Sequence, residues 1–291
     1  MHGPYFGEVA SAAPRMFAPG LVSRRHHEFT AAFSPAGDEF FYTVGNPRRS
    51  YSALVRMVRD AKGIWSAPEV APFSGRYHDA DPFFSADGSR LYFISKRPAT
   101  ADPKPQKDFD IWFVEQVGDK NGRRWGEPVN AGPQINSADN EYYVSLTRAG
   151  TVYFSRKGDI HRAVPSGDSY EVEVLPPEVN GSGASSDEFD AYVAPDESFL
   201  IFAAERPDSL GAADIYVSFR ADGKWQPARS LGPVINSKEL EYCPMLSPDG
   251  AYFFFTSLKS PDTHSSDRPR TLEQLFRPST PSTMAWAIFI G

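Results

Sequence analysis

The sequence is poor in the features that mark several common site types. It has one cysteine, Cys243, among 291 residues, so neither an intrachain disulfide nor a cysteine-based zinc site can form. No apolar run approaches the roughly 20 residues of a membrane-spanning helix. The first residues lack the basic and apolar segments of a signal peptide, so we expect a cytoplasmic chain or one whose signal has been removed. Neither a phosphate-binding glycine loop nor a hydrolase nucleophile elbow occurs.

Acidic residues outnumber basic residues in this chain. The chain has 30 Lys and Arg against 37 Asp and Glu, a net charge of -7, which disfavours binding of nucleic acid through a broad basic face. A protein, a carbohydrate or another small ligand is a better partner, and we expect no membrane insertion. Hydrophobic residues make up 41% and aromatic residues 14% of the chain, enough for a large core rich in strands.

One short phrase recurs five times along the chain. An acidic residue, here called the head acid, is followed by a turn of the type Ser-Pro-Asp-Gly and then by an aromatic strand, as in Asp79–Gly88 before Leu91-Tyr92-Phe93. Copies separated by about 50 to 60 residues are typical of propeller blades. The head acids are Glu28, Asp79, Glu141, Glu188 and Glu241.

Each copy is long enough for four strands. The third strand begins at an Asp-Ile-aromatic phrase, at Asp110, Asp159 and Asp214. The fourth carries a Trp-x-x-Pro phrase, at Trp65, Trp125 and Trp225, where proline is tolerated because that strand is outermost. Because these three tryptophans occupy equivalent places, we expect them to pack between blades. A related phrase precedes the first copy, so the N-terminus is predicted to complete the last blade.

We therefore predict an all-β fold, a β-propeller most simply of five blades, with six also open, closed by an N-terminal strand. The whole of 1–291 is expected to be one domain. Its predicted blades cover about 28–75, 78–135, 141–179, 188–235, and 241–291 with 14–23.

These phrases resemble the TolB-like (WD-like) β-propeller repeat family. The resemblance is carried best by Ser85-Ala86-Asp87-Gly88, Ser95-Lys96-Arg97-Pro98 and Asp110-Ile111-Trp112, and it covers roughly 14–258. It implies a bacterial, often exported protein, periplasmic or secreted, that acts as a monomeric recognition platform. TolB itself is similar to a six-bladed ring, whereas this chain has five copies.

The head acids are the first candidates for a site. Because the innermost strand lines the channel, we expect their five carboxylates to gather around the axis, where a divalent cation such as calcium would relieve their repulsion. A competing interpretation is structural, since a residue present in every repeat is most simply one that stabilises the repeat. The arginines after the second strand are expected to pair with the aspartates that open the third.

Blades also differ, and function is expected where they do. Two blades add a carboxylate two residues after the head acid, Asp81 after Asp79 and Asp190 after Glu188, and alternation on a strand predicts that each pair faces the same way. With His27, His78 and Tyr77 they form a predicted ligand-binding set at the channel mouth. Asp79, Asp81, Glu188, Asp190 and His78 are also a candidate metal set.

Two specific functions remain open from the sequence, beside a purely structural role as a repeat module of a larger assembly. The first is a non-catalytic platform that binds a ligand or a protein at an acidic channel mouth, with no cofactor required. The second is a glycoside hydrolase or lyase in which Asp79, Asp81, Glu188 or Asp190 act as acid and as nucleophile or base. Cys243 is expected to be a packed thiol rather than a nucleophile.

Overall fold

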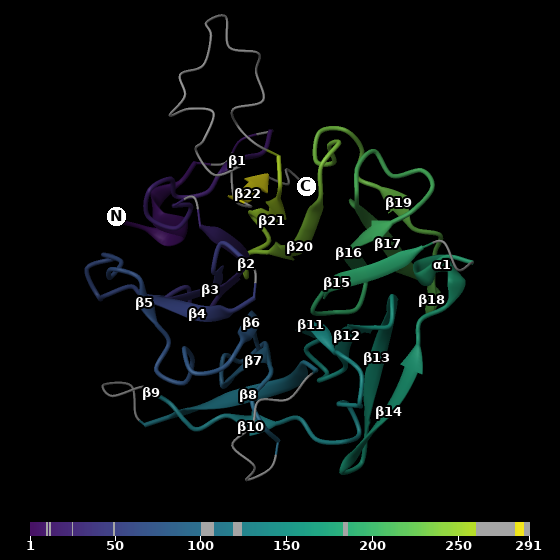
Figure 1. Cartoon of the computed structure of the whole chain (residues 1–291), viewed down its shortest axis with the longest axis horizontal. Helices are drawn as coiled ribbons and strands as arrows, with labels where there is room; N and C mark the ends of the chain where they lie inside the picture. The colour runs from purple at the N-terminus through teal and green to yellow at the C-terminus, as the bar shows by residue number, and fades with distance from the viewer. Residues whose placement is uncertain are drawn as a thin grey trace, which may run out of the picture.

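Strands make up nearly all of the regular structure. The computed structural model describes residues 1–9, 11, 13–24, 26–48, 50–99, 108–118, 124–182, 186–259 and the backbone of 283–287. The described strands form antiparallel sheets that stand around a common axis in the arrangement of a β-propeller, and five such sheets are present in the described residues (Figure 1). Two short helices, η1 (Pro4–Gly7) and α1 (Pro177–Asn180), lie at the edge of the ring. No helix in the described residues is long and apolar enough to cross a membrane.

In every sheet the strand that carries or follows the head acid is innermost, and the next two strands of the chain follow it outward. Sheet 1 contains β2 (His27–Phe33), β3 (Glu39–Gly45), β4 (Ser52–Val58) and β5 (Glu69–Val70). Sheet 2 contains β6 (Asp79–Phe84), β7 (Arg90–Ser95), β8 (Asp110–Val117), β9 (Arg124–Trp125) and β10 (Val129–Asn130). Sheet 3 contains β11 (Tyr142–Leu146), β12 (Val152–Arg156), β13 (Asp159–Ser166) and β14 (Ser169–Val174). Sheet 4 contains β15 (Asp187–Val193), β16 (Phe199–Glu205), β17 (Asp214–Ala221), β18 (Lys224–Trp225) and β19 (Arg229–Ser230). Sheet 5 contains β20 (Glu241–Leu246), β21 (Phe253–Ser257), β22 (Thr283–Ala287) and β1 (Arg15–Met16).

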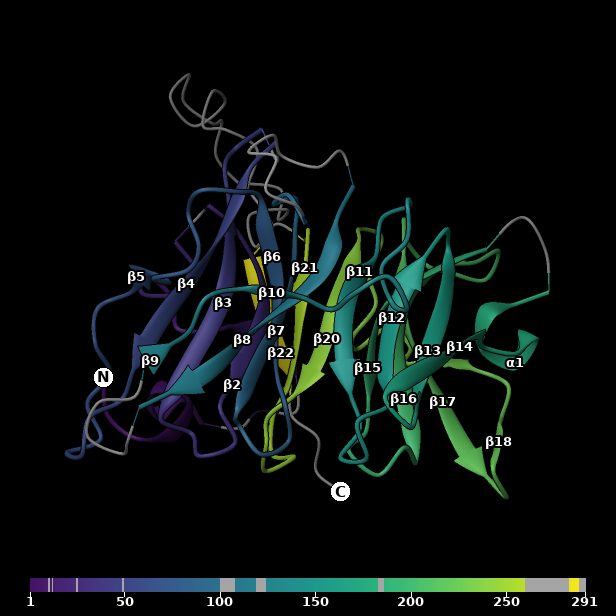
Figure 2. The same ribbon diagram turned by 90° about the horizontal axis from the view of Figure 1, so that it is seen from below.

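The innermost strands contact one another in a ring. β2 contacts β6, β6 contacts β11, β11 contacts β15, β15 contacts β20, and β20 contacts β2. Figure 2 shows these strands side by side when the ring is viewed at 90° to its axis. Residues near the start of each inner strand are thereby brought close to the axis from five directions.

The ring is closed by the N-terminal segment. β1 pairs with β22, with Arg15 opposite Trp286, so that the outermost strand of sheet 5 comes from the start of the chain. The predicted closure by an N-terminal strand is confirmed. Residues 260–282, which were assigned to the last blade, lie outside the described part of the chain.

The repeated phrases occupy the predicted places. The third strands β8, β13 and β17 begin at Asp110, Asp159 and Asp214. Trp125 and Trp225 are buried between sheets: Trp125 packs edge-on against Phe41 of sheet 1 with ring centroids 6.0 Å apart, and Trp225 against Tyr153 of sheet 3. Trp65 is also buried, but it packs against Phe6 of η1 and Phe33 of its own sheet. Burial of such large rings contributes to the stability of each repeat.

A repeated asparagine fastens each linker to the sheet before it. The Asn136 amide accepts a hydrogen bond from Ile111 N at 2.8 Å and donates one to Ile111 O at 3.0 Å. The same pair of bonds joins Asn180 to Ile160 and Asn236 to Ile215. These amides continue the hydrogen bonding of the third strand where no strand lies beside it, which satisfies buried backbone groups.

Candidate functional site

The five head acids are buried and bound within their own part of the ring. Glu28 is 1% exposed and the other four are 0% exposed. The Asp79 carboxylate forms an ion pair with Arg97 at 2.8 Å and accepts hydrogen bonds from Ser95 and Ser74. The carboxylates of Glu141 and Glu188 pair in the same way with Arg156 and Arg206, each at 2.8 Å.

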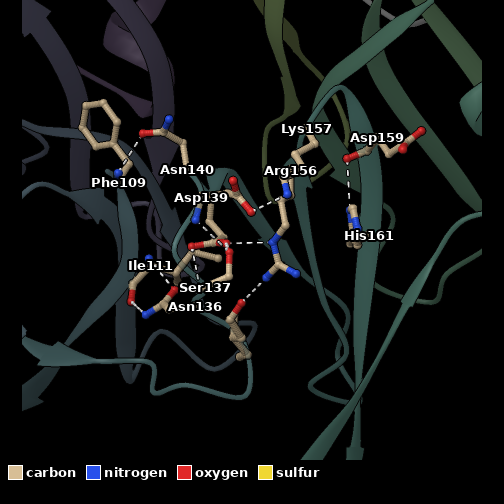
Figure 3. Close-up of polar contacts among 12 residues, drawn as sticks. Phe109, Ile111, Asn136, Ser137, Asp139, Asn140, Arg156, Lys157, Asp159 and His161 are labelled. Atoms are coloured by element: carbon tan, nitrogen blue, oxygen red, sulfur yellow. Dashed lines mark hydrogen bonds and ion pairs between the residues drawn. The ribbon is translucent and has the colours of Figure 1, made fainter. Parts of the chain in front are cut away.

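For Glu28 and Glu241, the hydrogen bonds found among the described residues come from serines and backbone groups. Glu241 accepts hydrogen bonds from the hydroxyls of Ser237 and Ser257, both at 2.7 Å. Glu28 accepts from the backbone N–H groups of Arg24 and His26. Figure 3 shows Arg156 and Ser137 of sheet 3 and its linker near each other, and both donate to the same oxygen of Glu141, Arg156 at 2.8 Å and the Ser137 hydroxyl at 2.7 Å.

Two geometric predictions are therefore wrong. The head acids do not face one another across the axis, because each carboxylate binds groups of its own sheet or of the linker before it. The arginines Arg156 and Arg206 pair with head acids rather than with Asp159 and Asp214. Burial raises the pKa of Glu28 and Glu141 and raises that of Glu188 to about 7, and the bonds to these groups oppose the shift.

The position two residues after each head acid has an unusual backbone. These five residues have φ between +46° and +55°, the left-handed region that non-glycine residues rarely adopt. In every inner strand the pairing register shifts at this point, as in a β-bulge. We call these residues the axial residues: Thr30, Asp81, Tyr143, Asp190 and Cys243.

The bulge separates side chains that regular alternation would place together. Asp79 and Asp81 were predicted to project the same way, but Asp79 binds Arg97 within sheet 2 whereas Asp81 accepts a hydrogen bond from Thr30 of sheet 1. Glu188 and Asp190 differ in the same manner, since Arg206 binds the first and Cys243 the second. The prediction that each pair shares a face is wrong because a left-handed residue re-aims its own side chain.

The axial residues contact one another across the sheets. The Thr30 hydroxyl donates to Asp81 Oδ1 at 2.6 Å and lies 3.0 Å from Cys243 Sγ. Cys243 donates from its backbone N–H at 3.1 Å and from its thiol at 3.2 Å to Asp190 Oδ2. Asp81 Oδ1 lies 4.0 Å from the same sulfur. The carboxylates of sheets 2 and 4 therefore meet on either side of the sheet 5 thiol.

Tyr143 supplies the fifth side chain of this cluster. Its hydroxyl donates to the carbonyl of Pro244 at 2.6 Å, which ties sheet 3 to sheet 5. The preceding residue, Tyr142, is 39% exposed, and its pKa is raised by partial burial and by the charges of Asp81 and Asp190. The Tyr142 hydroxyl is therefore close enough to both axial carboxylates to be affected by their charges.

Burial dominates the electrostatics of the axial residues. Asp81 and Asp190 are 6% and 8% exposed. Desolvation raises the pKa of Asp81 to about 7, with a further contribution from the charge of Asp190, and raises the pKa of Asp190 to about 6 against the bonds from Cys243. Burial and the two carboxylates raise the pKa of the Cys243 thiol well above its ordinary value. The pair therefore retains a proton close to neutral pH, and the thiol stays protonated.

The other residues predicted for the ligand site, His27, His78 and Tyr77, lie outside the cluster of axial residues. His27 Nε2 lies 3.2 Å from the hydroxyl of Tyr242, and His78 packs edge-on against Phe109 with centroids 4.8 Å apart. The Tyr77 ring lies 5.8 Å from the Arg97 guanidinium. Within the described residues no group of three or more His, Cys, Asp or Glu side chains is arranged to hold a metal ion, so the proposed metal set is not assembled.

The sequence analysis missed Thr30 and Tyr143 and treated Cys243 only as a packed thiol. The alignment of the five copies shows that this position varies, but the conformation that its residues share is visible only in the structure. Two residues after the head acid, the backbone conformation is the same in every sheet while the residue changes from Thr to Asp, Tyr, Asp and Cys. A repeat that retains a backbone feature and varies its side chain provides a place for specific chemistry.

The sequence matches no protein-family model and no curated protein. Solved structures similar to this chain include TolB from Acinetobacter baumannii, at 16% identity over 78% of this chain and 48% of that one, with a TM-score of 0.45. They also include the periplasmic gluconolactonase of Pseudomonas aeruginosa, at 13% identity over 79% of this chain and 64% of that one, with a TM-score of 0.47. A third is prolyl oligopeptidase B from Galerina marginata, at 15% identity over 79% of this chain and 30% of that one, with a TM-score of 0.45. The chain spans less than two thirds of the length of each.

Proposed function

We propose that this chain is a ligand-binding β-propeller whose ligand is recognised at the axial residues. The observation that carries the proposal is the meeting of two carboxylates from sheets 2 and 4 at one buried thiol, on a backbone feature present in all five sheets. Structural needs alone do not account for this pair, because the head acids already provide each sheet with a buried and paired carboxylate.

The ligand class follows from the chemistry of the cluster. Asp81 and Asp190 present carboxyl groups whose raised pKa values let them accept or donate hydrogen bonds near neutral pH, and Tyr142 places a partly exposed ring nearby. A small ligand with hydroxyl or amine donors and an apolar face, such as a sugar or an organic amine, satisfies both features. Calcium is a weaker candidate, since it takes six or more oxygen ligands and the axial cluster has few.

Calorimetry with a panel of sugars and amines tests this proposal. The double variant Asp81→Asn/Asp190→Asn removes both carboxylates at nearly constant volume, and Asp168→Asn, at an exposed position, is the matched control. A ligand that binds the wild type and the control but binds the double variant at least about tenfold more weakly supports the axial site. A ligand that binds all three equally well contradicts it.

A glycoside hydrolase or lyase is the second candidate, favoured by two neighbouring carboxyl groups whose pKa values are raised to about 7 for Asp81 and about 6 for Asp190. Its catalytic pair would be Asp81 and Asp190, because arginines engage the carboxylates of Asp79 and Glu188. Turnover of aryl glycosides that is lost in Asp81→Asn and in Asp190→Asn would favour this function over simple binding. Turnover that survives both substitutions would rule out this pair.

The architecture of the whole protein belongs to the same proposal. We infer a single five-bladed domain over 1–291, supported by the ring of contacts among the five inner strands and by the pairing of β1 with β22. The resemblance of the repeated phrases to exported TolB-like proteins supports a monomer in the periplasm or outside the cell. Cell fractionation and light scattering test these two points.

A further inference from the structure

Sheet 3 has an outer edge unlike those of the other sheets. The outermost strands β1, β5, β10, β18 and β19 have two residues each, whereas β14 has six, Ser169–Val174. The sequence accounts for the difference, because the Trp-x-x-Pro phrase that interrupts the other outer strands is absent here and the next proline is Pro176. Figure 1 shows β14 at the periphery of the ring, between β13 and the outside.

The pairing of β14 with β13 fixes which backbone groups point outward. Leu175 N donates to Ile160 O, and the register places Val174 opposite His161. Hydrogen-bonded pairs alternate with non-bonded pairs in an antiparallel ladder, so Tyr170, Val172 and Val174 direct their N–H and C=O groups away from β13. In the described part of the chain, no backbone hydrogen bond reaches these outward groups.

The free edge is accessible at both its middle and its end. Val172 is 36% exposed and Val174 54% exposed. Beside the end of the strand lies a groove of about 530 Å³, lined by Glu173–Leu175 and by residues 223–227 of the β17–β18 hairpin. An edge of this kind, regular and uncovered, is a template for one more strand.

The charges on β14 indicate which strand it accepts. Glu171 and Glu173 lie on one face, and the three outward-bonding residues place their side chains on the other. Glu173 forms an ion pair with Arg162, its neighbour on β13, so a basic residue on an added strand would continue a ladder of alternating charge across the sheet. If a second copy paired antiparallel through its own β14 about Val172, Glu171 of each copy would face Glu173 of the other, which disfavours self-association. A partner with lysine or arginine at these positions would instead form cross-strand pairs of opposite charge.

We propose that β14 binds an extended peptide segment of a partner protein, in which apolar residues alternate with basic ones, by adding it as a fifth strand to sheet 3. Main-chain hydrogen bonds to Tyr170, Val172 and Val174 provide the affinity. Glu171 and Glu173 provide the preference for basic residues. This surface is separate from the axial residues, so an experiment can contradict peptide binding at β14 and leave ligand binding at the axial residues untouched, and the reverse.

A fluorescein-labelled peptide of alternating lysine and valine is the probe, titrated with the full chain at about 0.15 M salt, where weak charge attraction is screened. Its comparison peptide has the same sequence and charge but carries N-methyl groups on the valines, which removes the N–H groups that face β14. The variant Val172→Pro removes one outward N–H group and leaves the bonds to β13 intact, since proline is tolerated when its nitrogen faces outward. Val172→Thr retains the edge and is the matched control.

We expect binding of the unmodified peptide by the wild type and by Val172→Thr, and binding at least about tenfold weaker for the methylated peptide and for Val172→Pro. The methylated peptide supplies this comparison even if Val172→Pro does not fold. Equal binding of the two peptides overturns the proposal, as does no binding at about 1 mM. A dimer in sedimentation that Val172→Pro abolishes would assign the edge to a second copy and also overturn it.

Discussion

Asp79 and Asp81 lie two positions apart on β6, yet the first binds Arg97 of its own sheet and the second accepts a hydrogen bond from Thr30 of the neighbouring sheet. The left-handed conformation of Asp81, with φ of +55°, separates them. The same separation in sheet 4 divides the acidic residues of this chain into two classes. Head acids hold each sheet to its linker, and axial acids face other sheets, so the two classes should respond differently to substitution and to pH.

Replacing an axial acid should change the pH dependence of stability. A carboxyl whose pKa is raised in the folded chain contributes stability that is full below about pH 4 and is lost as the pH rises toward its folded value near 7. In Asp81→Asn this loss is absent, so the fall in unfolding free energy between pH 5 and pH 8 should be smaller by about 1 to 3 kcal/mol. Urea denaturation across this range measures it.

Asp168→Asn is the control for that series, because Asp168 is exposed. It should reproduce the wild-type profile. Glu188, whose pKa is also raised, contributes equally to all three proteins and cancels in the comparison. Parallel profiles for the wild type and Asp81→Asn would show that the axial carboxyl titrates normally.

Removing the partner of a head acid should destabilise the fold at every pH at which the acid is ionised. In Arg97→Ala the Asp79 carboxylate, 0% exposed, is left without its cation, which should cost about 3 to 5 kcal/mol. Arg90→Ala removes an ion pair with Glu115 in the same sheet, but both side chains are about half exposed and the expected cost is below about 1 kcal/mol. Denaturant midpoints of the two variants measure the difference, and similar losses would contradict the structural role of the buried pair.

The sequence predicted the order of strands well and the site poorly, for identifiable reasons. Phrases such as Asp-Ile-aromatic at Asp110 recur because every sheet needs the same start to its third strand, and repetition is visible in a sequence. The bulge is not visible, because Thr30, Tyr143 and Cys243 are not residue types that favour positive φ. Without the bulge, strand alternation placed Asp79 beside Asp81. The long edge of β14 had a sequence signal, the missing Trp-x-x-Pro phrase, but its exposure depends on neighbouring sheets.

A turn in sheet 4 offers a separate test of backbone strain. Glu197 has φ of +61° at the place where the other sheets have Gly37, Gly88, Gly150 and Gly250. Its carboxylate binds Arg162, Arg220 and the Tyr153 hydroxyl, which explains why a strained residue is retained there. Glu197→Gly and Glu197→Ala lose these bonds equally, but only glycine relieves the backbone. The glycine variant should therefore be more stable than the alanine variant by about 0.5 to 1 kcal/mol.

The matched comparison for Glu197 uses Glu171, an exposed residue of the extended strand β14. There the order should reverse, with Glu171→Ala at least as stable as Glu171→Gly, because glycine loses more conformational freedom on folding. Thermal unfolding of the four variants gives both differences. The same order at both positions would mean that the turn at Glu197 is not strained.

The reactivity of the Cys243 thiol measures how far the fold suppresses its thiolate. The thiol is 3% exposed, and burial together with Asp190 and Asp81 raises its pKa, so the reactive thiolate is scarce in the folded chain. With a chromogenic disulfide at pH 8, we expect the native chain to react at least about a hundredfold more slowly than the chain in guanidinium, which should release one equivalent. The variant Asp168→Cys adds an exposed thiol and should react promptly with one equivalent while Cys243 reacts slowly. Equally fast reaction of Cys243 in the folded and unfolded chains would show that the fold does not suppress its thiolate, and the raised pKa values of the carboxyl pair beside it would then lose their support.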